Sequence, residues 1–338
     1  MNINPSALAS INDLLALVTR WQHLAPEYQD GLSSHLPMAL HALHALGADK
    51  ARLTGFADHY VRRFDATPST APGQVLLHWQ DHRGDFSRFA DLRATFAAVV
   101  ARLGSQRAMQ QALPDLWPGV AAAAFHGLIR TAHAWEMAHD DELAFGLAYW
   151  ASRWQPTKSA PLADGLPFEV WAATLSEHVE APRPAGRLIS ERIEQIQATS
   201  AFVHLSSSLL LTPNTLRQLA WFAADHFSRS GNFTLLHLVT GCRAARVLLT
   251  AAPASEQGAL PALVSAFTAA FLASGIEQNL ARMATEAEAV SWSGILPTVL
   301  LSNDDHIAKI VHACFDEGAA YAQPAYLQAA QRAIAARE

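Results

Sequence analysis

The sequence predicts an all-α protein built as one large domain resembling a helical bundle. Alanine and leucine dominate the 338 residues, and apolar residues recur at spacings of three and four, which is the periodicity of a buried helix face. Clear strand alternation is missing except around residues 200–207, and we discount that stretch. Hydrophobic residues make up 51% of the chain and charged residues 16%, which is enough for a large core.

The apolar spacing predicts a helix in each of several segments, with ends marked by proline, glycine or a capping side chain. Pro37 suits a first helical turn, and Gly47 and Gly104 suit the residue after a last turn. Thr212 or Asn214 could cap one helix, and Asp304 or Asp305 another. The predicted helices cover 6–21, 37–46, 87–103, 119–144, 182–199, 215–227, 234–250, 260–286 and 305–315.

Three segments rich in proline, glycine and small polar residues are predicted loops: 66–74, 155–167 and 180–186. The loop at 155–167 is the best candidate boundary inside the single domain 1–338. It would divide the chain into two helical halves, 1–155 and 168–338.

Composition argues against several classes of protein. The net charge is −6, and neither a basic run nor interleaved aromatic and basic residues favours nucleic acid. Cys242 and Cys314 have no paired spacing, so a disulfide framework is not expected. The first residues lack the pattern of a signal peptide, and no apolar stretch of about 18 residues runs without polar interruption. We therefore expect a cytoplasmic protein without a membrane partner, and the oligomeric state stays open.

Histidine is unusually frequent. The chain has sixteen histidines beside three lysines, and several histidines lie inside apolar segments. Histidine is the commonest metal ligand, so a buried group of histidines suggests a metal site. Lys309 follows His306 by one helical turn within the apolar sequence IAKIV, where arginine is otherwise the usual base of this chain. This placement suggests that the amine of Lys309 has a specific purpose.

Four separate segments carry the candidate site. His126, Arg130 and His133 stand at i, i+4 and i+7, so they share one helix face. His306 and Lys309 stand at i and i+3 and also share a face. The other two segments contain His35 with His41 and His44, and His237 with Arg243 and Arg246. Helical bundles commonly build metal sites from side chains on several helices, so we predict a buried metal site with histidine ligands.

Each residue also has a purely structural interpretation. A single histidine in an apolar helix is more often a core residue with a hydrogen bond, and we expect this of His41 and His44, while His312 fits either role. Buried Arg130 needs a partner, for which Glu136 is a candidate, and Lys309 could extend its amine to solvent. The remaining histidines near charged neighbours are expected at the surface: His23, His59, His78, His82, His139 and His178.

The same segments resemble the questin oxidase-like family, and we interpret the chain as a bacterial member. The resemblance begins with His35-Leu36-Pro37-Met38, followed by Ala-Leu-Gly-Ala at 45–48. It continues in the family's order through HWQDHRGDF (78–86), FHGLIRTAHAWE (125–136), LLHLVTG (235–241) and DDHIAKI (304–310). Each motif alone is weak, but the ordered set covers nearly the whole chain and is fairly specific.

The resemblance implies an oxygenase that acts on aromatic polyketides, chiefly anthraquinones. Such enzymes open a ring with O2, by Baeyer–Villiger-like oxidation or C–C cleavage, and the site is similar to a non-haem iron centre with several histidines and a carboxylated lysine. Six protein ligands would leave iron no open position, so we expect at least one to lie outside the ligand set, with His133 and His237 the first candidates. The implied metal ligands are His35, His126, His133, His237, His306 and Lys309.

The implied chemistry is consistent with these residue types. Imidazole binds iron and also copper, nickel and zinc, so another divalent metal could occupy the site. Carboxylation requires Lys309 as a neutral amine, which burial favours. We predict that Lys309 and Arg130 act in catalysis, with Arg130 stabilising negative charge on the substrate. Aromatic side chains that could stack on a planar substrate are Trp79, Trp135, Trp221 and Phe233.

Three positions depart from the family pattern. Ser34 replaces an asparagine that often precedes the first histidine, Met38 stands where fungal members tend to have another histidine, and Arg243 stands near a position where some members carry histidine. Two alternative functions remain. The first is an NADPH-dependent Baeyer–Villiger oxidase without metal, although no G-x-G-x-x-G follows a strand. The second is a non-catalytic helical binding or scaffold protein whose histidines only pack in the core.

Overall fold

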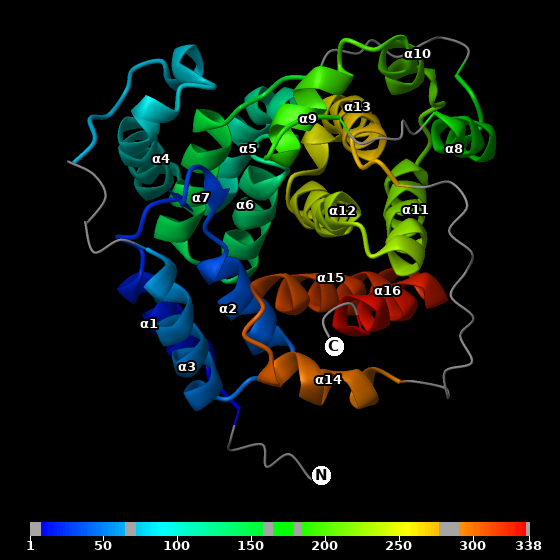
Figure 1. Ribbon diagram of the computed structural model, residues 1–338. Coiled ribbons are helices and arrows are strands. Elements are labelled where there is room, and N and C mark those ends of the chain that lie inside the picture. The colour runs from blue at the N-terminus through cyan, green and yellow to red at the C-terminus, as the bar shows by residue number, and fades with distance from the viewer. Residues whose placement is uncertain (1–7, 65–71, 158–164, 179–183, 277–290, 336–338) are drawn as a thin grey trace.

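The computed structural model confirms the all-α fold class, with 73% of the chain helical (Figure 1). It describes residues 8–64, 72–157, 165–178, 184–276 and 291–335. Within these ranges the strands are β1 (Glu27–Tyr28) and β2 (Leu32–Ser33), which pair antiparallel. The first helices are α1 (Ile11–Arg20), α2 (Leu36–Ala45), α3 (Lys50–Tyr60), α4 (Phe89–Leu103), α5 (Ser105–Leu116), α6 (His126–Glu136), α7 (Asp140–Ser152) and α8 (Phe168–Glu177). The later ones are α9 (Ile189–Ile196), α10 (Ser200–Ser208), α11 (Thr215–Ser230), α12 (Phe233–Ala251), α13 (Glu256–Leu272), α14 (Trp292–Leu301), α15 (Asp305–Tyr321) and α16 (Pro324–Ala335).

Several helix ends follow the local chemistry of the sequence. Ser10 and Asp13 form a capping box that starts α1. Gly104 ends α4 at a φ of 77°, a conformation that glycine adopts without a steric penalty. The Asp304 side chain accepts hydrogen bonds from the backbone N–H groups of His306 and Ile307, which identifies Asp304 as the N-cap of α15. These caps fix where the helices begin and end, including the helix that carries His306.

The prediction of a single long helix over 119–144 is wrong, because the chain forms two helices there, α6 and α7. The backbone from Ala123 to Phe125 has positive φ values, so α6 begins at His126. Ala138 also has a positive φ, at 52°, and His139 then caps α7 by accepting a hydrogen bond from the backbone N–H of Glu142. Apolar periodicity does not register a break of one turn when the flanking residues stay buried.

Other boundaries differ in smaller ways. The helix predicted from 182 begins at Ile189 as α9, and the one predicted from 260 begins at Glu256 and ends at Leu272 as α13. The predictions for 1–7, 179–183 and 277–286 lie outside the described residues. The discounted strand at 200–207 is helix α10. Five further helices were not predicted: α3, α5, α8, α14 and α16.

Four helices from distant parts of the chain meet at the centre of the molecule. Figure 1 shows α2 in blue, α6 in green, α12 in yellow and α15 in orange around one interior region, and these helices contact one another. The main hydrophobic cluster extends from Met38 to Ala333, so it includes residues from both sides of the loop at 155–167. The interior is therefore built jointly by the two parts of the chain, while a division into halves stays a prediction.

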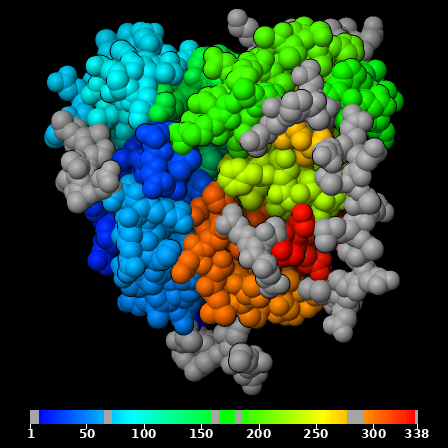
Figure 2. Space-filling model, in the orientation of Figure 1, coloured from blue at the N-terminus to red at the C-terminus, as the bar shows by residue number. Residues whose placement is uncertain are grey.

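Early and late segments also lie side by side at the surface, as the blue and orange regions of Figure 2 show. There the Arg52 guanidinium donates a hydrogen bond of 3.0 Å to the side-chain oxygen of Asn303. Helix α12 is long and apolar enough to cross a membrane, but 78% of the relevant window is buried inside the protein. Its central place in the core accounts for that apolar composition.

Candidate metal centre

Four imidazoles from four helices converge in the interior. His35 immediately precedes α2, His126 begins α6, His237 lies on α12, and His306 lies on α15. The ring centroid of His35 is 4.6 Å from that of His126 and 4.7 Å from that of His306. The His126 and His237 centroids are 4.9 Å apart. These rings, together with Lys309, are called the first histidine cluster below.

Hydrogen bonds fix the orientation of three rings in this cluster. His126 Nδ1 donates to the carbonyl oxygen of Ala123 at 2.5 Å, and His237 Nδ1 donates to that of Phe233 at 2.8 Å. His35 Nδ1 donates to the carboxylate of Asp305. Because a carbonyl or carboxylate oxygen only accepts, Nδ1 carries the proton in each ring. In the neutral ring, Nε2 then keeps a free lone pair, which is the arrangement of a metal-binding histidine.

The lone pairs in the cluster oppose one another. His35 Nε2 and His126 Nε2 are 2.6 Å apart. Burial lowers the pKa of His35 to about 3 and the pKa of His126 well below 6.5, so neither ring holds a second proton near neutral pH. Two unprotonated nitrogens at this distance repel unless a cation lies with them. The donor set therefore fits a divalent metal that accepts imidazole ligands.

Asp305 organises the cluster from one side. It is 1% exposed, and it accepts a hydrogen bond of 2.7 Å from Arg63 Nη1 in addition to the one from His35. His306 Nδ1 lies 3.3 Å from the same carboxylate. A carboxylate behind a metal-binding histidine fixes the ring and raises its basicity. From the sequence, Asp305 was predicted only as a possible helix cap. The two aspartates directly before His306 were the signal that could have indicated a carboxylate beside the imidazoles.

Lys309 lies inside the cluster rather than at the surface. Its side chain follows His306 by one turn of α15, and the residue is 2% exposed, so it does not reach solvent. Burial lowers the pKa of Lys309 to about 7. Burial is the largest cause that lowers the pKa values of His35, His237 and His306, and the charge of nearby Lys309 is the second. The same charge also lowers the pKa values of His126 and His133. Among the described residues, no hydrogen bond to Nζ is found.

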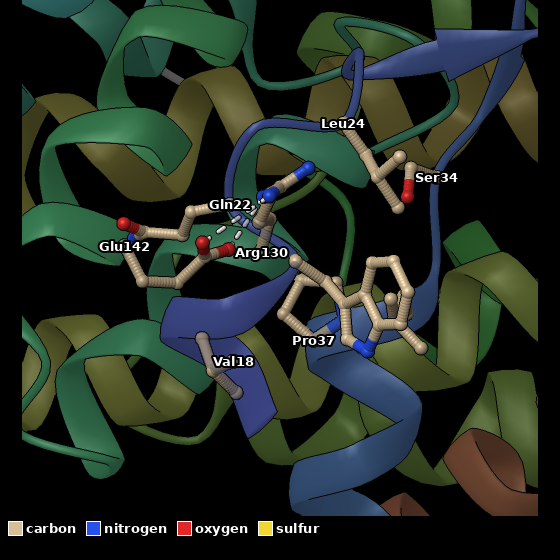
Figure 3. Close-up of a pocket in the computed structure, with 9 residues that line it drawn as sticks. Val18, Gln22, Leu24, Ser34, Pro37, Arg130 and Glu142 are labelled. Carbon is tan, nitrogen blue, oxygen red and sulfur yellow. Dashed lines mark hydrogen bonds and ion pairs between the residues drawn. The ribbon is translucent and has the colours of Figure 1, made fainter. Parts of the chain in front are cut away.

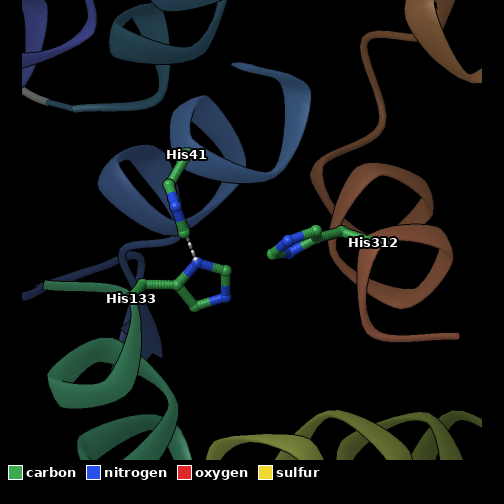
Figure 4. Close-up of side chains that lie close together, drawn as sticks. All are labelled: His41, His133 and His312. Carbon is green, nitrogen blue, oxygen red and sulfur yellow. Dashed lines mark hydrogen bonds between the residues drawn. The ribbon is translucent and has the colours of Figure 1, made fainter. Parts of the chain in front are cut away.

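His133 lies in a different group, together with His41 and His312, which we call the second histidine cluster (Figure 4). His133 Nδ1 is 2.8 Å from His41 Nδ1, and its ring centroid is 5.5 Å from that of His312. The structure thus brings five of the six candidate ligands together and places His133 elsewhere. The sequence analysis expected His41 to pack in the core and left the role of His312 open.

Arg130 has a partner other than the predicted one. Glu136 is not that partner: Arg130 Nε donates to Glu142 at 2.6 Å, and its Nη2 donates to the same carboxylate at 3.2 Å. The guanidinium also lies 3.6 Å from the ring centroid of Phe145. Figure 3 shows this pair beside Pro37, lining a cavity of about 10 Å³, which is roughly enough for one water molecule. The carboxylate of Glu142 thus balances the positive charge of Arg130. A catalytic role for Arg130 stays a prediction.

Phe233 is the predicted aromatic residue that borders the first histidine cluster. Its ring centroid is 4.8 Å from the rings of both His237 and His306, and the residue is 46% exposed. The His306 side chain is 19% exposed, so this side of the cluster is the one nearest solvent. Trp79 instead packs on Phe96, and Trp135 packs partly buried against the core. Trp221 lines a separate surface depression on α11.

Together, the fold and this cluster define an all-helical protein with a buried set of oriented imidazole donors. The chain belongs to the questin oxidase-like family, whose model matches residues 32–314, most of the chain. Both histidine clusters and Lys309 lie inside the matched range. The family's name is that of an oxidase, which indicates an oxidoreductase. No curated protein matches the sequence significantly.

Proposed function

We propose that this protein is a metal-dependent oxygenase with non-haem iron as the metal. Its substrate would be an aromatic polyketide such as an anthraquinone, and the reaction would either cleave a ring oxidatively or insert an oxygen atom into it. One observation carries the proposal: imidazoles from four helices converge, and three of them have Nδ1 bound to an oxygen acceptor. The questin oxidase-like family supports the aromatic substrate class.

The metal would be held by His35, His126, His237 and His306 together with Lys309. When bound, iron supplies the ability to bind O2 and to exchange electrons with it. Asp305 keeps the His35 ring oriented, and the apolar surroundings of α12 exclude water from the far side of the cluster.

Lys309 would serve as a carbamate rather than as an amine. Its nitrogen adds to the carbon of CO2 and loses one proton, which leaves an anionic carboxylate on Nζ. Burial of the amine at 2% exposure favours its neutral form, which is the form that can attack CO2. A metal held in the site would balance the negative charge that the carbamate adds. A carboxylate oxygen is a harder ligand than imidazole and suits iron in a mixed site.

The substrate would approach from the side formed by Phe233 and His306. The exposed ring of Phe233 offers a flat apolar face to a planar ring system. A substrate stacked there lies against His306 and His237, whose centroids are both close to the Phe233 ring. This placement brings the aromatic rings of the substrate to the edge of the metal site.

The test measures bound iron and substrate-dependent O2 consumption in the purified protein and in single variants. We expect His306→Ala and Lys309→Met to lose both the iron and the O2 consumption, because each removes a ligand. His226→Ala is the matched control, since His226 is a half-buried imidazole on α11 bonded to the Phe222 carbonyl.

Three results would contradict the proposal. Full activity in both ligand variants would exclude the metal site. Activity that survives chelation and requires NADPH would indicate a metal-free oxidase. Absence of bound metal, with thermal stability unaffected by a chelator, would indicate a binding or scaffold protein.

A further inference from the structure

The second histidine cluster has the composition of a metal site of its own. His41 on α2, His133 on α6 and His312 on α15 each offer one ring nitrogen, and these three atoms lie within 4.8 Å of one another. Figure 4 shows His312 directed toward the facing pair of His41 and His133. We propose that this cluster binds a second divalent transition metal, of the zinc type.

The helical spacing separates this site from the first. The same three segments supply both clusters: six residues separate His35 from His41 and His306 from His312, and seven separate His126 from His133. A helix rises 1.5 Å per residue, so the two clusters lie about 10 Å apart along the helices. Metals that share one reaction are about 4 Å apart, so the second site is an independent one.

The donors are neutral and incompletely paired. Burial lowers the pKa of His41 to about 3 and the pKa values of His133 and His312 well below 6.5. One hydrogen bond, of 2.8 Å between the two Nδ1 atoms, joins His41 and His133. In the described part of the chain, His312 Nδ1 is buried without a hydrogen-bond partner, and the residue is 6% exposed. Leaving such a buried atom unpaired destabilises the fold, and a metal would give it a partner.

Arg243 is the charged group that acts on all three rings of this cluster, and it lowers the pKa values of His41, His133 and His312 after burial has done so. Arg243 is close, but its guanidinium is paired with Glu136 at 2.6 Å and with Asp316 at 2.8 Å. Arg246 pairs with Asp316 and with Glu317, so three carboxylates surround two guanidinium groups. These carboxylates offset the two positive charges, so a bound cation would meet guanidinium groups whose charge is already balanced.

A fourth ligand is within reach. Glu136 Oε2 lies 4.0 Å from His41 Nδ1, at the edge of the cluster. Three imidazoles and one carboxylate form a donor set that zinc binds with four-coordinate geometry. Such an ion would tie α2, α6 and α15 together beside the first cluster. Its role would be to hold His35, His126 and His306 in place.

The test titrates the metal-free protein with Zn²⁺ or Co²⁺ and measures the number of equivalents bound. We expect the wild type to bind one equivalent more than either His312→Gln or His133→Gln. His126→Ala should lose the other equivalent and keep the one at the second cluster. His44→Ala is the matched control on α2, because His44 is half-buried and belongs to neither cluster, and it should bind as much as the wild type.

The proposal fails if His312→Gln and His133→Gln bind the same number of equivalents as the wild type. Circular dichroism of each variant shows whether it folds. If a variant does not fold, anomalous diffraction from wild-type crystals soaked in Zn²⁺ decides, and a map without a peak between the three rings overturns the proposal. A wild-type protein that binds metal at the second cluster and none at the first would instead contradict the proposed function.

Discussion

Lowering the pH should unfold the metal-free protein within one to two units below the ordinary histidine pKa of about 6.5. The two clusters contain seven histidines, six of them buried and His306 half-buried, and burial is the main cause that lowers the pKa of each. The pKa is about 3 for His35 and His41 and about 4 for His306. The unfolded chain therefore binds these protons below pH 6.5, while the folded chain does not.

The sign and size of the effect follow from this difference. Because the unfolded state binds more protons between about pH 6.5 and pH 4, the free energy of unfolding falls as the pH falls through that window. Each histidine contributes roughly 1 kcal/mol per pH unit, so the seven together contribute roughly 7–10 kcal/mol per unit. A domain of this kind is stable by about 5–15 kcal/mol, so a drop of one to two units is sufficient.

The assay is urea unfolding followed by circular dichroism, in the presence of a chelator, at a series of pH values from 7.5 to 4.5. His41→Gln and His312→Gln should each reduce the slope of stability against pH by about one proton. His204→Gln provides the reference for removing an exposed imidazole. Stability that stays constant between pH 6.5 and pH 4.5 would refute the burial of neutral histidines.

Three further predictions concern single side chains. Arg130→Met should destabilise the fold by about 3–5 kcal/mol in urea unfolding, because Glu142, at 1% exposure, loses its partner. Adding Glu142→Leu should restore part of the lost stability, and a cost below about 1 kcal/mol for Arg130→Met would contradict this prediction. Gly127→Ala should lower the thermal midpoint, since the added Cβ would lie 2.6 Å from the Trp150 backbone, whereas Gly258→Ala meets no atom within 4 Å and is the control. Phe233→Ala should weaken anthraquinone binding in fluorescence titration while iron content is retained, and unchanged affinity would remove Phe233 from the substrate site.

Periodicity predicted most of the helices that build the interior. The helix that follows His35 and the helix that carries His237 were placed within one residue at each end. The helix that carries His306 begins where predicted, at Asp305, but ends at Tyr321, six residues later than predicted. The break between α6 and α7 was missed, since it is made by alanines with positive φ, which composition does not reveal. Helix α3 was missed although Leu53, Phe56, Ala57 and Tyr60 stand at i, i+3, i+4 and i+7 and form its buried face.

The sequence predicted a buried site with several histidines, but not which of the rings lie together. Burial of His126, His237 and Lys309 was expected from their apolar neighbours, and the structure places them together with His35 and His306. A shared helix face suggested that His126 and His133 belong to one site, but a separation of seven residues spans about two turns of helix. That distance is long enough for two clusters, and only tertiary packing shows which rings meet. The partner of Arg130 is likewise on another helix.

The convergence of four imidazoles around a metal is the central claim, and anomalous diffraction at the iron edge tests it most directly. Crystals of the protein expressed with iron should show one strong peak bounded by His35, His126, His237 and His306, with carboxylate density on Lys309 Nζ. A map without that peak, in which the four rings contact one another and Lys309 carries an unmodified amine, would contradict the account.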